Sequence, residues 1–330
     1  MRTSRKVLIG LVGLLLIGIG VFGFSLIEKK TKTRKGFAVR IPIQEKIFQQ
    51  KRAAPPAWML QTILRDLEPF SKSGITRKML DDLFQGERIS KHKLIRFSIA
   101  SGKLAVSVHN DLLDKRYFRH VLAAFEKLLT LAELPDVDFV VSLEDGFYSN
   151  VDFPFSPLFV FSKTEGLSPF IFIPDFKAMT GYPTLQKEIL AGNSQYPWEK
   201  KRSLAFWRGT TSGGYLTKDN WRRISRPKLA LFSLNNPQDL DAKITEVSQA
   251  ETEVPALIAA EGLIGKRATQ KSHLKYKYLV DVDGNSCTFE RYFWTHLSNS
   301  VVLKQTTSNR QWYYGALEPY QHYIPVKEDL

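Results

Sequence analysis

The chain has 330 residues, of which 43% are apolar and 12% aromatic, so it is long and apolar enough for two α/β domains and does not have the composition of a disordered protein. Its formal net charge is +14, but residues 1–40 hold nine Lys and Arg against one Glu. The modest surplus elsewhere suits a protein that binds a diphosphate and forms no basic stripe of the kind that binds nucleic acid. The only cysteine, Cys287, excludes an intramolecular disulfide and a thiolate metal cluster, and it favours a reducing compartment.

The first predicted element covers residues 7–27, a run of 21 residues without a charged side chain. At a rise of about 1.5 Å per residue, this run spans the roughly 30 Å hydrocarbon layer, so we predict a transmembrane helix in preference to a cleaved signal peptide. More basic residues follow the run than precede it, and the positive-inside rule therefore places the globular part in the cytoplasm. The sequence thus predicts a single-pass membrane protein with an anchor over residues 1–30 and a basic juxtamembrane linker over residues 31–56.

Helices and strands are predicted in alternation beyond the linker. Apolar residues have helical spacing at residues 58–67, 79–83 and 117–129. Short apolar runs, rich in β-branched and aromatic residues, predict strands at residues 139–143, 158–161, 170–173, 204–207, 229–232, 276–282, 301–303 and 323–326. Runs that are apolar at every position are typical of strands buried on both faces, as in parallel sheets covered by helices.

The order of elements is most regular after residue 276, where helices predicted from residues 289 and 310 separate three strands. We therefore predict an α/β fold, with an N-terminal domain over residues 57–180 and a C-terminal domain over residues 181–330. Ligands of such sheets bind beyond the carboxyl ends of the strands, and we therefore expect the functional site there.

The first candidate site follows the predicted strand at residues 204–207. Residues 205–214 read Ala-Phe-Trp-Arg-Gly-Thr-Thr-Ser-Gly-Gly, so Arg208, Gly209 and Ser212 bring a guanidinium group, backbone N–H groups and a hydroxyl to the end of a buried strand. These groups can hold the oxygens of a diphosphate. The alternative is a solvated arginine before a turn. The segment does not match the Walker pattern, which disfavours a P-loop nucleotidase.

The second candidate site is the segment at residues 281–291, Asp-Val-Asp-Gly-Asn-Ser-Cys-Thr-Phe-Glu-Arg. It predicts a strand end, a turn and the start of a helix that could face a nucleotide, with Asn285 and Thr288 as donors or caps. Asp281 and Asp283 share one face of the strand and could hold a divalent cation on a diphosphate. The alternative is that the two aspartates only form a turn.

The third candidate is Asp145, which follows the predicted strand at residues 139–143. A carboxylate at the carboxyl end of a buried strand can act as a general base. The alternative is an Asp-Gly turn. The histidines lack the spacing of a zinc site, and no Gly-x-Ser-x-Gly elbow of a serine hydrolase occurs.

Ordered motifs between residues 60 and 330 resemble glycosyltransferase family 90, which includes capsule-associated xylosyltransferases, lipopolysaccharide glycosyltransferases and protein O-glucosyltransferases. These motifs are residues 66–79, 140–146, 161–164, 198–201, 205–209, 241–242, 273–279, 283–285, 298–305 and 322–327. The resemblance implies two Rossmann-like domains of the glycosyltransferase-B type, with the nucleotide sugar held by the C-terminal domain. It also implies an inverting transfer without a metal or another cofactor, from a nucleotide-sugar donor, for which this family prefers UDP.

The resemblance further implies that Asp145 is the base, that Arg208 clamps the diphosphate and that Arg291 with Thr288 belongs to the donor pocket. The leading hypothesis is transfer of a glucose- or xylose-like sugar to lipopolysaccharide or another lipid-linked glycan at the membrane. One alternative is a protein O-glycosyltransferase in a secretory lumen. Another, suggested by the short carboxyl terminus, is a non-catalytic membrane protein that binds a glycan or nucleotide.

Overall fold

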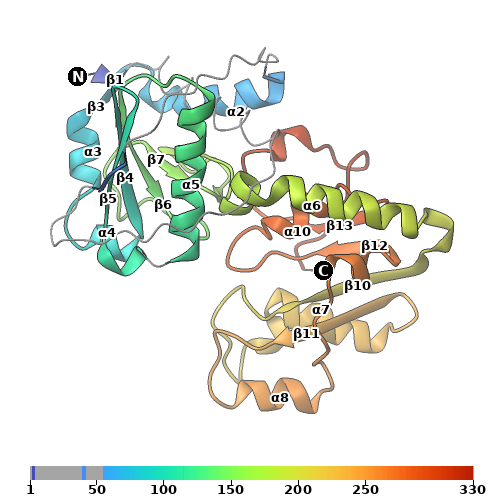
Figure 1. Ribbon diagram of the computed structural model, residues 1–330. Helices are drawn as coiled ribbons and strands as arrows, with labels where there is room; N and C mark the ends of the chain where they lie inside the picture. Colours follow the sequence, from blue (N-terminus) through green and yellow to red (C-terminus); the bar gives the residue numbers. More distant parts are fainter. Residues whose placement is uncertain (1, 4–38, 42–54, 114, 330) are drawn as a thin grey trace. The chain divides into compact units, whose positions relative to one another are not determined.

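The computed structural model describes residues 2–3, 39–41, 55–113 and 115–329. The chain forms two compact units (Figure 1). Unit 1 comprises Met1–Pro183 and Arg310–Ala316, and unit 2 comprises Thr184–Asn309 and Leu317–Leu330. Each unit combines helices with a β-sheet, so the predicted α/β class is confirmed.

The main sheet of unit 1 has six strands in the order β2-β5-β4-β6-β7-β9. These are β2 (Val39–Ile41), β4 (Leu94–Ala100), β5 (Lys103–Val108), β6 (Val137–Ser142), β7 (Leu158–Val160) and β9 (Phe170–Phe172). The first four strands in this order pair antiparallel, whereas β6, β7 and β9 run parallel. The antiparallel part was not expected from the sequence. The β4–β5 pairing within it follows from a tight hairpin, in which Ser101 and Gly102 have φ values of 49° and 71°.

Helices α3 (Arg77–Leu83) and α5 (Arg116–Leu131) flank this sheet in Figure 1. The ring of Phe125 on α5 packs 4.7 Å from Phe97 and 4.9 Å from Phe139, measured between centroids, and all three rings are buried. The unit also contains α2 (Ala57–Leu67), α4 (Arg88–Lys91), the start of α6 (Phe176–Gln195) and short elements. The short elements are β1 (Arg2–Thr3), β3 (Ile75–Thr76), β8 (Lys163–Thr164), η1 (Glu68–Phe70), η2 (Asn110–Leu112) and η5 (Tyr314–Ala316).

The sheet of unit 2 has five strands in the order β11-β10-β12-β13-β15, and all its neighbours are parallel. These are β10 (Arg202–Thr210), β11 (Leu240–Glu246), β12 (Tyr276–Asp281), β13 (Val301–Gln305) and β15 (Ile324–Val326). The helical elements are α7 (Ser225–Asn235), α8 (Val254–Ala260), α9 (Gln270–His273), α10 (Glu290–Thr295), η3 (Trp198–Lys200), η4 (Trp221–Arg223) and the rest of α6. The two-residue strand β14 (Asn309–Arg310) lies where the chain passes from unit 2 to unit 1.

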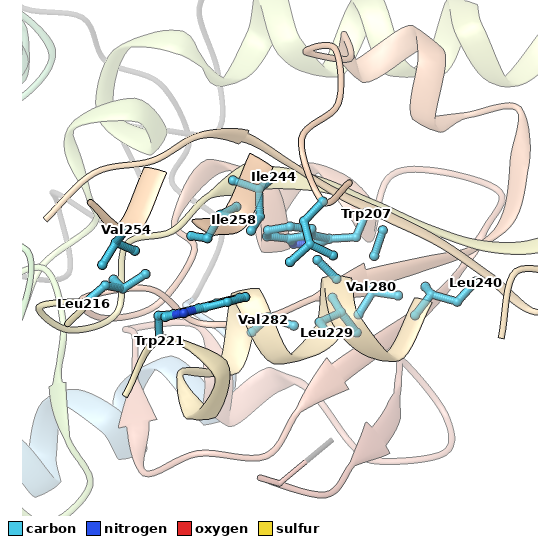
Figure 2. Packing of buried hydrophobic residues seen from close by; sticks show 13 residues of the cluster. Trp207, Leu216, Trp221, Leu229, Leu240, Ile244, Val254, Ile258, Val280 and Val282 are labelled. Carbon is cyan, nitrogen blue, oxygen red and sulfur yellow. The ribbon is translucent and has the colours of Figure 1, made fainter. Parts of the chain in front are cut away.

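Both faces of this parallel sheet are buried, as the continuous apolar runs predict. One face packs against α7 and α8 in a cluster that contains Trp207, Leu229 and Ile258. Figure 2 shows the indole of Trp207 inside this cluster, beside Ile244. The other face, with Phe206 and Leu279, packs against the second half of α6 and against α10.

Two predicted elements differ from the structure. Residues 229–232, predicted as a strand, lie inside the helix α7. A run of four apolar residues cannot distinguish a strand from the buried part of a helix, and Pro227 is tolerated because it lies in the first turn of α7. The helix predicted from residue 310 is also wrong, since only the 3₁₀ turn η5 forms there.

The predicted membrane anchor, residues 7–27, lies outside the described residues, as does most of the predicted linker. Within the part of the chain that the structure describes, no helix is both long enough and apolar enough to cross a bilayer.

Candidate functional site

Two of the predicted candidate segments meet in unit 2, because β10 and β12 are neighbouring parallel strands whose carboxyl ends lie at the same edge. The backbone N–H of Gly213, in the loop after β10, donates to Oδ1 of Asn285, in the loop after β12, at 3.1 Å. A Cβ atom on Gly284 would lie 2.8 Å from Oγ of Ser212, so only glycine allows this approach. The predicted residues Gly209, Ser212 and Asn285 therefore lie in one pair of contacting loops.

Arg208 is already bound by protein groups. Its guanidinium lies 2.8 Å from Oδ1 of Asp241 and donates to the backbone oxygens of Trp207 and Asp241 at 2.8 and 2.9 Å. The guanidinium carbon lies 4.3 Å from the ring centroid of Phe206. The side chain is therefore held in one orientation at the strand end and is not a solvated arginine, while its role as a diphosphate clamp stays a prediction.

Arg226, in the first turn of α7, is a residue that the sequence analysis missed. Its guanidinium donates to Oγ of Ser212 at 2.6 Å and to the backbone oxygens of Thr210 at 3.2 Å and Asp283 at 3.1 Å. Burial, followed by the charge of Arg291, lowers the pKa of Arg226 to about 10. Arg226 thus joins the two loops, and no local motif marks it because its partners are far away in the sequence.

Arg291, on α10, carries a donor that its surroundings leave unused. One terminal nitrogen, Nη2, donates to the backbone oxygen of Arg208, but Nη1 is buried and has no hydrogen-bond partner within the described residues. Burial lowers the pKa of Arg291, and the charge of Asp281 opposes this shift. A buried charged donor without an acceptor is costly, and a bound anion would supply one.

The indole of Trp207 lies between these arginines and the core. The guanidinium carbons of Arg226 and Arg291 lie 6.0 and 5.7 Å from the Trp207 ring centroid. A Cβ atom on Gly209 would lie 2.5 Å from the same indole, so this glycine lets the strand pass over the ring. Phe289, just before α10, has a φ of 45°, a strained conformation for a bulky residue that often marks a functional segment.

The aspartates after β12 are buried and ion-paired. Nζ of Lys304, on β13, lies 2.9 Å from Oδ1 of Asp281 and also contacts Oδ1 of Asp283. The hydroxyl of Thr288 donates to Oδ2 of Asp281 at 2.5 Å, so Thr288 bonds the strand end and does not cap α10. The sequence missed Lys304, although a lysine within a buried strand opposite Asp281 is a signal that could have indicated it.

This edge of unit 2 carries a small excess of positive charge. Four cations, Arg208, Arg226, Arg291 and Lys304, face three carboxylates, those of Asp241, Asp281 and Asp283. One positive charge is therefore uncompensated in a largely buried setting, which favours an anionic ligand.

The remaining candidate, Asp145, lies in unit 1, in the turn after β6. It is half-buried and makes no hydrogen bond or ion pair with any residue that the structure describes. The charge of Asp145 acts on Tyr117, whose pKa is raised mainly by burial and additionally by that charge. The neighbouring Glu144 instead lies 3.3 Å from Nζ of Lys93. The geometry leaves the Asp145 carboxylate available as a proton acceptor, and its role as a base stays a prediction.

Comparison with known proteins identifies the family. The model of glycosyl transferase family 90 matches residues 51–330, which is most of the chain. The chain belongs to glycosyl transferase family 90. The predicted family is therefore confirmed and, at the level of the family, so is the predicted class of enzyme, a glycosyltransferase.

Curated relatives of this family member are named as glucosyltransferases. Protein O-glucosyltransferase 1 of Rattus norvegicus is 29% identical over 296 residues, which is 81% of this chain and 66% of the relative. Protein O-glucosyltransferase 3 of Mus musculus is 32% identical over 68% of this chain and 45% of its own length, and O-glucosyltransferase rumi of Drosophila melanogaster is 26% identical over 80% and 62%. The chain thus spans about two thirds or less of the length of these relatives.

The comparisons correct the predicted localisation. A cytoplasmic single-pass membrane protein that serves a lipid-linked glycan does not agree with relatives named for glucosyl transfer to protein. The prediction rested on the apolar run and on a narrow difference between two basic flanks, which is weak evidence for orientation, and we withdraw it.

Proposed function

We propose that this family 90 member transfers a glucosyl or closely related sugar from a nucleoside diphosphate sugar to a hydroxyl group of a protein. Binding of the sugar donor is supported by one observation in unit 2. Within the described residues, Nη1 of Arg291 is buried without a hydrogen-bond partner, and its guanidinium acts electrostatically on that of Arg226. Guanidinium groups match the oxygens of a diphosphate in shape and charge. The protein acceptor is supported by the names of the relatives and takes the place of the lipid-linked glycan that we first favoured.

The proposed donor site follows from the two loops after β10 and β12. Ser212 and Asn285 lie in these loops, which Arg226 and the Gly213–Asn285 hydrogen bond hold together. A diphosphate bound there would give Nη1 of Arg291 its missing acceptor. The parallel sheet of unit 2 also fits the Rossmann-like, nucleotide-binding half of a glycosyltransferase-B fold, which we propose for the chain.

The proposed reaction is a single displacement at the anomeric carbon. Asp145 takes the proton of the acceptor hydroxyl as its oxygen forms a bond to that carbon, and the bond from the carbon to the diphosphate oxygen breaks. The electron pair of that bond leaves with the diphosphate, and Arg208 and Arg291 stabilise the charge that develops. Attack opposite the leaving group inverts the anomeric configuration. We propose that the reaction needs no metal ion or organic cofactor besides the nucleotide sugar.

The test combines binding with turnover on the full chain. UDP should raise the melting temperature, because a ligand that binds only the folded form stabilises it. Incubation with UDP-glucose or UDP-xylose and a set of folded, serine-rich protein domains should add one sugar to a domain, as measured by intact mass. Transfer only to a lipid-linked glycan would contradict the protein acceptor. If UDP does not change the melting temperature and the donor sugar stays intact, the proposed transferase activity is contradicted, and the alternative of a non-catalytic protein is favoured.

A further inference from the structure

Three charged side chains form a buried cluster at the ends of β12 and β13. Asp281 and Lys304 are partners in the register of these parallel strands, and Asp283 follows two residues later on the same face. The residues are 0%, 5% and 7% exposed for Asp281, Lys304 and Asp283 respectively. The ammonium group contacts one oxygen of each carboxylate, at 2.9 Å for Asp281.

The other carboxylate oxygens are also occupied, by groups that tie the cluster to two loops. Oδ2 of Asp281 accepts from the Thr288 hydroxyl at 2.5 Å. Oδ2 of Asp283 accepts from the Thr307 hydroxyl at 2.6 Å and from Nδ2 of Asn309 at 3.2 Å. The cluster therefore fixes both ends of the segment 282–288, which carries Asn285, and the start of the segment after β13.

The ammonium group balances carboxylates that would otherwise repel each other. Burial by itself lowers the pKa of Lys304, but the charges of Asp281 and Asp283 outweigh it and raise this pKa above its ordinary value. Two buried carboxylates this close cannot both stay ionised without a nearby cation. Lys304 is the cation that contacts both carboxylates directly, and the charges of Arg226 and Arg291 also act on this pair.

We propose that Lys304 is the resident cation of the Asp281-Val-Asp283 pair and the positioning residue of the donor loop, occupying the place where a divalent metal would otherwise bind. Only the positioning role rests on the proposed function, because it assumes that the loop binds the donor. The role of Lys304 as a cation rests on contacts within unit 2. Removing the ammonium would leave two carboxylate oxygens, Oδ1 of Asp281 and Oδ1 of Asp283, beside a vacated space, and carboxylates are ligands that Mg²⁺ and Mn²⁺ prefer.

The test asks whether a metal can replace the lysine in the full chain. In EDTA, Lys304→Ala should lower the melting temperature by roughly 5–15 °C, the range for a broken buried ion pair. Excess Mn²⁺ should restore about half of that loss or more, because it would bind only the folded form. The wild-type protein should not respond to Mn²⁺.

Lys163→Ala is the matched control. Lys163, in unit 1, is also buried and lies 2.8 Å from Asp66, but it is paired with a single carboxylate. Its variant should lose stability without gaining a response to Mn²⁺. Equal Mn²⁺ shifts in the wild-type protein and in Lys304→Ala, or no shift in either, overturn the proposal.

A second comparison applies if Lys304→Ala does not fold. The double variant Asp283→Asn with Lys304→Met removes one charge of each sign and should melt above Lys304→Met alone. A double variant that melts no higher overturns the proposal, because the two charges would then not be coupled.

The positioning role has its own readout. Mn²⁺ should restore UDP affinity to Lys304→Ala, whereas an osmolyte that raises the melting temperature equally should not, and UDP affinity of the wild-type protein should be the same with and without Mn²⁺. Equal recovery with the osmolyte overturns the positioning role. If wild-type protein does not bind UDP, the proposed function fails, while the response of Lys304→Ala to Mn²⁺ still decides the role of the lysine.

Discussion

Acidic residues lie at two strand ends of this protein, and their environments are opposite. After β12, in unit 2, the carboxylates of Asp281 and Asp283 are buried, and each of their oxygens contacts a cation or a hydrogen-bond donor. After β6, in unit 1, Asp145 is half-buried and makes no hydrogen bond or ion pair within the described residues. The same residue type therefore builds structure at one strand end and is left available at the other.

The difference shows which carboxylate can do chemistry. A general base needs a lone pair that is free to accept a proton from the substrate. Protonation of the Asp281 and Asp283 carboxylates would weaken their contacts with Lys304, Thr288 and Thr307, which hold the loops. Sequence spacing does not separate the two cases, since each aspartate lies at or just after the end of a buried strand.

The strongest test of this comparison is Asp145→Asn. The amide keeps the shape of the side chain but cannot take a proton, so we expect turnover to fall by about 10² to 10⁴, the usual contribution of a general base. UDP affinity and melting temperature should stay close to those of the wild-type protein. Single-turnover rates and UDP titrations on one preparation measure both effects.

Glu144→Gln is the control for that measurement, because Glu144 is the adjacent carboxylate and already pairs with Lys93. It should leave turnover nearly unchanged. If Asp145→Asn retains the wild-type rate, Asp145 is only a turn residue, and the contrast between the two strand ends has no catalytic meaning.

Acid should destabilise unit 2 through His273. Burial, followed by the charge of Arg291, lowers the pKa of His273 from 6.5 to about 4. Between these values the unfolded chain binds a proton that the folded protein does not, so this contribution to stability is complete above pH 6.5 and is lost as the pH falls. The loss should reach about 3 kcal/mol near pH 4.

Urea unfolding between pH 7 and pH 4 measures this loss, and His273→Gln should flatten the profile. An unchanged slope in His273→Gln would mean that other groups cause the acid sensitivity. The test bears on the comparison of the two strand ends, because protonation of His273 adds charge to the buried part of unit 2 and leaves Asp145 in unit 1 unchanged.

Arg226→Lys should weaken the link between the two donor loops. A lysine cannot reach Ser212, Thr210 and Asp283 together, so buried acceptors would lose their donor. We expect UDP to bind roughly 10- to 100-fold more weakly and the melting temperature to fall. Calorimetric titration with UDP checks the first effect. Wild-type UDP affinity in this variant would show that the loops are held without Arg226.

Arg208→Lys should have a smaller effect. It keeps the charge and loses the forked contact with Asp241, so we expect donor binding to weaken by roughly 1–2 kcal/mol. Titration with UDP measures it, and Arg222→Lys is a control because Arg222 pairs with Glu261 on the exposed surface of unit 2. Unchanged affinity would make Arg208 a structural residue alone.

The sequence predicts β10, β12, β13 and β15 of unit 2 from their continuous apolar runs, but it misses β11, whose residues alternate between buried and partly exposed positions. It fails at residues 229–232, where a similar run belongs to a helix, and at the β4–β5 hairpin, where a Ser-Gly turn is a weak signal. The sequence marks the loops after β10 and β12 as candidate sites, but only the strand order of the sheet shows that the two loops meet. Arg226 and Lys304 could not be assigned, because their roles depend on partners that only the fold brings together.

The smallest expected effect is that of a chelator. Excess EDTA should leave turnover and UDP affinity unchanged if, as we propose, arginines and backbone donors of unit 2 hold the diphosphate. Lys304 already contacts Asp281 and Asp283 in the place of a metal. Initial rates with EDTA, and after Mn²⁺ is added back, measure this directly, with a metal-dependent glycosyltransferase assayed in parallel to show that chelation is complete. Loss of turnover in EDTA that Mn²⁺ restores would make the two aspartates metal ligands. Both strand ends would then take part in the reaction, and the contrast between structural and reactive carboxylates would no longer hold.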